Sequence, residues 1–197
     1  MIFNPSGIQN ELFEGLTELA KHLGVELGED GMPVCAEKCS DYGLSVICDG
    51  GRLTVKYAEK HHFFRAFGLA VQHLSKGETV FNVTEKAYFT MNGPMFDLSQ
   101  AASAFNITEL KSIIRRLALM GLNTLMLYTE DNYEVPSQPY FGYMRPRYTQ
   151  EELKELDGYA YSLGIEMIPC IQTLSHLQEA LKWKVYKDII SIPRLYA

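Results

Sequence analysis

Two apolar segments that run directly into polar side chains constrain the fold of this chain most strongly. Residues 123–128 (NTLMLY) lead without a turn residue into Thr, Glu and Asp at 129–131, and residues 165–171 (IEMIPCI) lead into QTLSH. Between them, TQEE at 149–152 has the form of a capping box that opens a helix, and Gly164 is placed to end it. Near-continuous apolar strands separated by helices are typical of parallel βα units that are covered on both faces.

The segments before residue 86 follow a different, α+β pattern. Apolar spacing predicts helices over 12–23 and 62–74, and two β-type runs at 44–48 and 53–57 flank the turn sequence DGGR. Helix, hairpin and helix together indicate a small sheet with helices on one face. We therefore expect an α/β chain with a boundary near residue 86: residues 1–85 form the α+β domain and residues 86–197 form the βα units.

Composition excludes several classes of function. The formal net charge is −6 and no cluster of Lys and Arg occurs, so we expect no nucleic-acid partner. No apolar run approaches the roughly 20 residues of a membrane span, and the first residues lack the pattern of a secretory signal. The four cysteines show neither disulfide-framework nor zinc-finger spacing. These observations predict a cytoplasmic protein without a metal site, a cofactor or a membrane partner.

Polar side chains follow each predicted strand of the second half. Asp97 follows the first strand, Glu130 and Asp131 follow the second, and His176 lies just beyond the third. In parallel βα folds, functional groups collect beyond the carboxyl ends of the strands, so these side chains are candidates for one site. A second interpretation stays open, because Asp after a strand also forms Asx turns or caps helices, and a single His is often only packed.

Four strings between residues 110 and 177 resemble one enzyme family. ALMGLN, LYTEDNYE, PYFGYMRPRYT and GIEMIPCIQTLSHL, in this order and spacing, resemble glycoside hydrolase family 20, in particular its bacterial intracellular β-N-acetylhexosaminidase branch. The helix HHFFRAFGLAVQHL is the most family-like part of the upstream segment. The resemblance implies a small α+β domain over 1–85, followed over 86–197 by about the first three units of a (β/α)8 TIM barrel.

The resemblance also implies a reaction and a set of roles. Such enzymes remove terminal β-linked N-acetylglucosamine or N-acetylgalactosamine with retention, and the substrate's own acetamido oxygen attacks the anomeric carbon. An Asp orients the acetamido group, and an adjacent Glu is the acid and base. The family pattern implies Asp131 and His176 as supports of that Glu, and Asp97, Gln100 and Glu130 as substrate-binding residues. The implied partner is a glycan or glycoconjugate ending in an N-acetylhexosamine.

The chain departs from the family pattern in three places. Gln100 and Pro146 stand where the family usually has Arg and Gly, and no Asp-Glu dipeptide follows Leu177. We therefore expect an amino-terminal fragment that lacks the catalytic pair, is inactive alone, and self-associates through the open edge of an incomplete barrel. Two alternatives remain: a non-catalytic carbohydrate-binding or assembly module, and a free-standing α/β enzyme that uses Glu130 or Asp131 as its acid.

Overall fold

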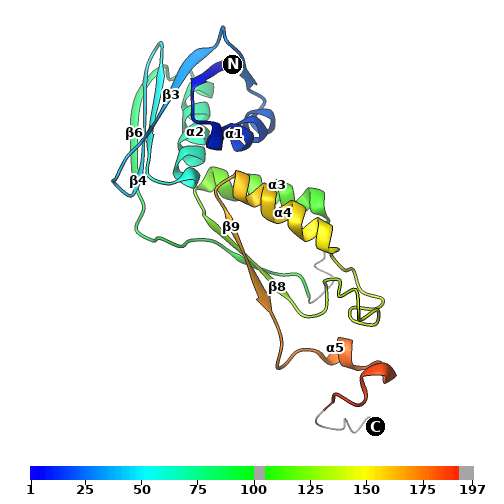
Figure 1. The fold of residues 1–197 in the computed structure, drawn as a ribbon. Helices are drawn as coiled ribbons and strands as arrows, with labels where there is room; N and C mark the ends of the chain where they lie inside the picture. The colour runs from blue at the N-terminus through cyan, green and yellow to red at the C-terminus, as the bar shows by residue number, and fades with distance from the viewer. Residues whose placement is uncertain (100–104, 191–197) are drawn as a thin grey trace.

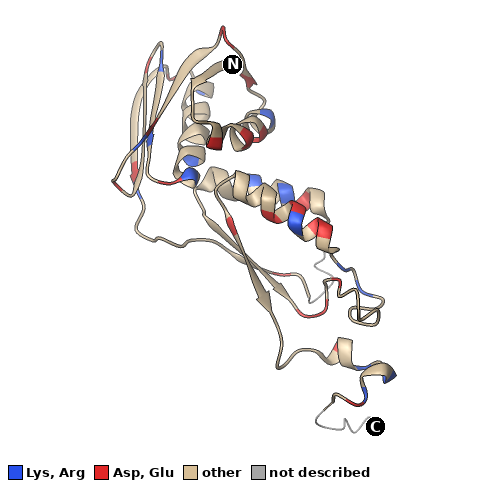
Figure 2. Cartoon of the chain, in the orientation of Figure 1, with Lys and Arg blue, Asp and Glu red and all other residues tan. Residues whose placement is uncertain are grey.

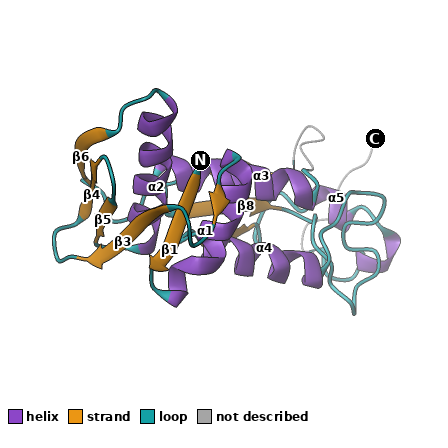
Figure 3. Cartoon of the chain, turned by 90° about the horizontal axis from the view of Figure 1, so that it is seen from above, coloured by secondary structure: helices purple, strands orange, loops and turns teal. Residues whose placement is uncertain are grey.

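The chain forms two sheets with a group of packed helices between them (Figure 1). The computed structural model describes residues 1–99 and 105–190. The first sheet has six strands, in the order β2-β1-β3-β5-β4-β6, and the second has three, in the order β7-β8-β9. Viewed from above, β8 is seen between α3 and α4, and the strands β4, β5 and β6 of the first sheet lie at the left of the view (Figure 3).

The first sheet is mixed and contains the predicted hairpin. Its strands are β1 (Ile2–Gly7), β2 (Glu26–Leu27), β3 (Met32–Lys38), β4 (Gly43–Asp49), β5 (Leu53–Tyr57) and β6 (Val80–Lys86). The strand β4 runs antiparallel to both β5 and β6, whereas β1, β2, β3 and β5 pair in parallel. In the hairpin turn, Asp49 Oδ1 accepts hydrogen bonds from the backbone N–H groups of Gly51 (3.0 Å) and Arg52 (2.8 Å). The sequence did not predict β1, β2 or β3.

Two amphipathic helices bury their apolar sides against this sheet. They are α1 (Asn10–Leu23), which ends at Gly24 in the left-handed conformation (φ 67°), and α2 (Lys60–Ser75). Phe63, Phe64 and Phe67 of α2 are fully buried. Both helices were predicted, because their apolar residues recur at the helical spacing and therefore occupy one face.

The second sheet consists of parallel βα units, as predicted. Its strands are β7 (Met95–Asp97), β8 (Thr124–Thr129) and β9 (Glu166–Ile171), linked by α3 (Ile107–Met120) and α4 (Gln150–Ser162). The predicted capping box opens α4: Thr149 Oγ1 accepts from Glu152 N (3.1 Å), and Glu152 Oε2 accepts from Thr149 N (2.8 Å). The short helices α5 (Gln178–Leu181) and η1 (Lys184–Tyr186) follow β9.

The strand β9 is less buried than its sequence predicts. None of its six residues is buried, whereas β8 buries four of six. Among the described residues β9 pairs with β8 alone, so its outer edge has no neighbouring strand. The expectation that both faces of these strands are covered is therefore wrong for β9, because an apolar run shows only that a strand can be buried.

The helices of the two units pack directly against one another. Arg65 of α2 donates to the backbone carbonyl of Leu119 at the end of α3 (3.1 Å), and Lys60 donates to the carbonyl of Tyr161 in α4 (3.2 Å). Tyr159 of α4 donates to Glu18 of α1 (3.0 Å). The first sheet ends at Lys86, where the sequence suggested a boundary, but the division into two domains stays a prediction.

The contact between Gly164 and His61 gives a test of this packing. Gly164 has φ +74°, and a Cβ there would lie 2.6 Å from the backbone nitrogen of His61. We expect Gly164→Ala to lower the free energy of unfolding by about 2 kcal/mol or more, since the left-handed conformation alone costs an L-residue about 1–2 kcal/mol. Urea denaturation measures this effect.

Gly158→Ala is the matched control. Gly158 lies within α4, and a Cβ there would meet nothing within 4 Å. Alanine should therefore stabilise the helix by about 0.5–1 kcal/mol. Equal unfolding midpoints for the two variants would contradict the close packing of α2 on the segment after α4.

The buried histidines at the start of α2 give a pH prediction. Burial, followed by the charge of His62, lowers the pKa of His61 to about 4 from its ordinary value of 6.5. Between these two values the unfolded chain binds a proton that the folded chain does not, so stability is lost as the pH falls from 6.5 to about 4. Urea midpoints across this range should fall less steeply in His61→Gln than in the wild type; identical slopes would argue against a neutral buried His61.

Candidate functional site

The carboxyl ends of β7 and β8 bring a group of buried polar residues together. Glu130, Asp131 and Asn132, which directly follow β8, are 7%, 1% and 2% exposed, and Ser99 beyond β7 is 6% exposed. Figure 2 shows acidic residues in the loops where these strands end. Buried carboxylates are unfavourable unless hydrogen bonds or opposite charges compensate for the lost water. Their partners therefore define the site.

A hydrogen-bond network joins the two strand ends. Ser99 Oγ accepts from the backbone N–H of Glu130 (2.6 Å) and donates to Asn132 Oδ1 (2.6 Å). Asn132 Nδ2 donates in turn to the carbonyl oxygen of Leu98 (2.6 Å). The network holds the turn after β8 in one conformation, so that Glu130 and Asp131 have fixed positions at the end of the sheet.

Arg145 supplies the positive charge of this site. Its Nη1 lies 2.9 Å from Asp131 Oδ1 and 3.9 Å from Glu130 Oε2, and its Nη2 donates to the carbonyl oxygen of Ser99. Arg145 comes from the long loop between β8 and α4, in which Gly142 (φ +66°) lies against the backbone carbonyl of Asp131. Arg145 lies in the string PYFGYMRPRYT, but the sequence predicts no role for it, because no local pattern shows which carboxylate an arginine will contact.

The pKa of Asp131 is raised above its ordinary value. Burial of the carboxyl group is the main cause, the charge of Arg145 opposes it, and the neighbouring charge of Glu130 adds to it. Asp131 Oδ1 is buried, and its ion pair with Arg145 is not aligned as a hydrogen bond. A carboxyl group with a raised pKa beside a second carboxylate is typical of functional sites.

His176 lies beside Glu130 rather than Asp131. Its Nδ1 is 3.7 Å from Glu130 Oε1, which also accepts a hydrogen bond from the hydroxyl of Tyr128 (3.3 Å). Among the described residues, no ion pair joins His176 to Asp131. The structure thus brings both residues to one cluster through Glu130, and the supporting roles that the resemblance implies for Asp131 and His176 stay predictions.

The remaining predicted site residues lie at the end of β7. Asp97 is exposed, and its Oδ1 accepts a hydrogen bond from the backbone N–H of Ser99 (2.8 Å), so the Asx turn weighed from the sequence is present. Gln100 lies outside the described residues.

In residues 1–99 and 105–190, no group of three or more His, Cys, Asp and Glu side chains is arranged to hold a metal ion. Within the same ranges, no helix is both long and apolar enough to cross a lipid bilayer.

Comparison with known proteins identifies the fold. No protein-family model and no curated protein sequence matches the chain. The solved structures that match include those of glycoside hydrolases, and they show that the chain has a glycoside-hydrolase-like α/β fold. More particularly, the chain has the fold of part of the family 20 β-N-acetylhexosaminidases, so the resemblance noted in the sequence is confirmed for the fold.

Three of these structures show the extent of the similarity. The family 20 exo-β-N-acetylglucosaminidase from Vibrio harveyi, in complex with N-acetylglucosamine, has a TM-score of 0.72 and 18% identity, over 91% of this chain and 34% of that chain. The Streptomyces coelicolor A3(2) β-N-acetylhexosaminidase has a TM-score of 0.71 and 20% identity, over 92% and 44%. A mutant Streptomyces plicatus β-hexosaminidase, in complex with the product GlcNAc, has a TM-score of 0.72 and 19% identity, over 91% and 43%. The chain therefore spans less than half the length of these enzymes.

Replacement of Asp131 by asparagine tests the electrostatics of the cluster. Because the folded-state pKa of Asp131 is raised, the ionised carboxylate opposes folding at neutral pH, and its neutral form does not. We expect Asp131→Asn to raise the free energy of unfolding at pH 7, with an advantage that shrinks as the pH falls towards 3.8. Urea denaturation at several pH values measures this effect.

Asp30→Asn, at an exposed position, serves as the control and should change the free energy of unfolding by no more than about 0.5 kcal/mol. A loss of stability in Asp131→Asn at pH 7 would show instead that the ion pair with Arg145 outweighs the cost of burial.

Proposed function

We propose that this chain is the amino-terminal part of a family 20 β-N-acetylhexosaminidase and that its strand-end cluster forms one side of the sugar pocket. The observation that carries the proposal is the buried pair Glu130–Asp131, held at the carboxyl ends of parallel strands by Ser99 and Arg145. Sites of this architecture form at that end of the sheet. Family 20 structures with the same fold have been solved with N-acetylglucosamine bound.

The second sheet supports an incomplete barrel. The strands β7, β8 and β9 are parallel, adjacent and in chain order, as consecutive strands of a (β/α)8 barrel would be. Met167, Ile168 and Ile171 of β9, with Leu153 of α4, line an apolar cavity of about 370 Å³ next to the open edge. In this proposal further barrel units cover this edge, and without them the edge promotes self-association.

The proposed reaction gives each candidate residue of the site a role in binding the sugar or in supporting the catalytic acid. Asp97 and Glu130 would accept hydrogen bonds from sugar hydroxyl groups, and Gln100 would contribute a neutral amide where the family pattern has Arg. Asp131 and His176 would support the catalytic acid and tune its pKa. Arg145 would hold the two carboxylates in place.

The catalytic pair itself is proposed to come from further polypeptide. A substrate-assisted mechanism requires one carboxylate to orient the acetamido group and one acid to protonate the leaving oxygen, and the family pattern supplies both from an Asp-Glu dipeptide. The 197 residues contain no such dipeptide. The chain therefore contributes binding and support, and hydrolysis depends on the added pair.

Binding and hydrolysis by the 197-residue chain test the proposal separately. We expect N-acetylglucosamine to perturb the NMR signals of the strand-end residues, and no release of 4-nitrophenol from its 4-nitrophenyl β-glycoside above the buffer rate. Asp97→Ala should weaken binding about tenfold or more, because a hydrogen bond to a charged group contributes about 1.5–3 kcal/mol.

Asp30→Ala removes an exposed carboxylate in the first sheet unit and should leave the affinity unchanged. Equal weakening in both variants would contradict a sugar site at the strand ends. Turnover by the chain alone, abolished in Asp131→Asn, would instead make it a self-sufficient enzyme.

A further inference from the structure

Three aromatic side chains form a cluster beside the acidic turn that follows β8. The ring centroids of Tyr140 and Tyr143 lie 5.5 Å apart. Trp183, which lies between α5 and η1, is 5.0 Å from Tyr143 and 6.2 Å from Tyr140, and it meets the Tyr143 ring edge to face. Two segments that are distant in the sequence therefore meet at these rings. No role proposed above uses them.

The residues on either side of Tyr143 place it close to Asp131. A Cβ at Gly142 would lie 2.0 Å from the backbone carbonyl oxygen of Asp131, and Arg145 contacts the Asp131 carboxylate at 2.9 Å. Tyr143 lies between these two contacts in the sequence. Because consecutive Cα atoms are about 3.8 Å apart, the Cα of Tyr143 is within about 8 Å of the Asp131 carbonyl oxygen. One short carbohydrate chain can therefore reach both the strand-end cluster and the aromatic rings.

The loop that carries Tyr140 and Tyr143, the tyrosine pair, is held by the chain itself. The backbone N–H of Tyr143 donates to the carbonyl oxygen of Tyr140 (3.2 Å), and Nη1 of Arg147 donates to the carbonyl oxygen of Phe141 (2.9 Å). The ring of Phe141 packs against that of Tyr133, with 5.1 Å between the centroids. A surface that is ordered before a ligand arrives binds at a lower entropic cost.

The tyrosine pair stays accessible in spite of these contacts. Tyr140 is 43% exposed and Tyr143 is 45% exposed, and no described residue forms a hydrogen bond with either phenol hydroxyl. Trp183 differs, because its indole N–H is buried and the ammonium group of Lys182 lies over its ring, 5.3 Å from the centroid. Trp183 therefore supports the pair, and the two tyrosines provide the surface that a ligand can reach.

We propose that the tyrosine pair binds the second sugar of a β-linked carbohydrate chain whose terminal N-acetylhexosamine lies at the strand-end cluster. The inference rests on the sugar site proposed above and extends it to a substrate class, namely chains of at least two sugars. The C–H groups on one face of a sugar ring pack against an aromatic ring, and the hydroxyl groups at its edge form hydrogen bonds. Tyrosine offers both contacts, since it has an apolar ring and a polar tip. Aromatic side chains beside a few polar groups that fix orientation are typical of ligand sites.

A comparison of two ligands on the 197-residue chain tests this inference. The ligands are the methyl β-glycoside of N-acetylglucosamine and the β-1,4-linked disaccharide of N-acetylglucosamine. We expect the disaccharide to bind about tenfold more tightly, because it adds the contacts with the two rings. Only the disaccharide should shift the NMR signals of the Tyr140 and Tyr143 rings to saturation. In both ligands the terminal sugar is β-linked, so the ratio of the two affinities measures the second sugar.

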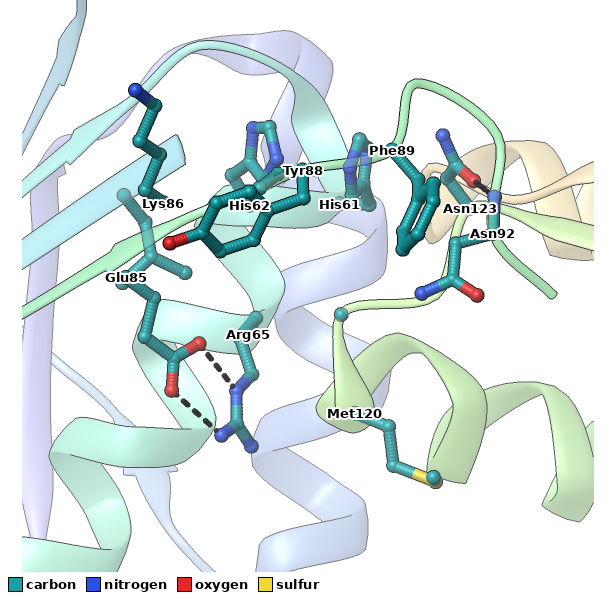
Figure 4. A pocket seen from close by; sticks show the side chains of 13 residues that line it. His61, His62, Arg65, Glu85, Lys86, Tyr88, Phe89, Asn92, Met120 and Asn123 are labelled. Carbon is teal, nitrogen blue, oxygen red and sulfur yellow. Dashed lines mark hydrogen bonds and ion pairs between the residues drawn. The ribbon is translucent and has the colours of Figure 1, made fainter. Parts of the chain in front are cut away.

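Variants assign the gain in affinity to the tyrosine pair. Tyr140→Ala and Tyr143→Ala should each reduce the ratio of affinities several-fold, whereas Tyr143→Phe, which keeps the ring, should retain most of it. Tyr88→Ala is the matched control and should keep the full ratio. Tyr88 is 86% exposed and lines a pocket with Asn123 at the opposite end of β8 (Figure 4). Partial unfolding weakens the binding of both ligands equally, so it does not change the ratio.

The outcomes separate this inference from the sugar site on which it rests. Binding of the methyl glycoside without any gain for the disaccharide would overturn the second-sugar site and leave the first site intact. A gain that survives both alanine variants, or that is also lost in Tyr88→Ala, would overturn the assignment to the tyrosine pair. Failure of both ligands to bind would overturn both proposals.

Discussion

The arrangement of the two sheets and their helices depends on the hydrogen bonds of the Arg65 guanidinium. It binds Glu85 on the last strand of the first sheet and the carbonyl of Leu119 at the end of α3, so it joins three elements of both units. The close approach of Gly164 to His61 fixes α2 against the segment after α4. Because α3 and α4 lead into β8 and β9, these contacts set the position of the parallel strands and of the groups at their ends.

The acidic cluster shows the opposing demands of stability and function. Its burial opposes ionisation of Asp131, and the charge of Arg145 and a backbone hydrogen bond at Asp131 offset this effect only in part. Ser99 and Asn132 accept hydrogen bonds from the backbone N–H of Glu130, and these hydrogen bonds hold the turn after β8. A fold selected for stability alone would favour neutral side chains here, and a buried carboxyl group with a raised pKa is typical of functional sites.

The two ends of β8 carry different chemistry. Its carboxyl end leads into the buried carboxylates of Glu130 and Asp131, and its amino end, at Asn123, borders a pocket that Arg65 and Glu85 also line. The six residues of β8 therefore separate an acidic cluster from a pocket with charges of both signs.

The sequence by itself determined the local features: the helices, the hairpin turn, the capping box of Thr149 and Glu152, and the polar residues after each parallel strand. Periodicity and caps involve neighbours within a few residues, so they are legible in one chain. Only the tertiary structure decided the strands β1, β2 and β3, the exposure of β9, and the partners of Glu130 and Asp131. Such features depend on contacts between segments that are distant in the sequence, as in the ion pair of Arg145 with Asp131. A local sequence pattern does not show which distant segments come together.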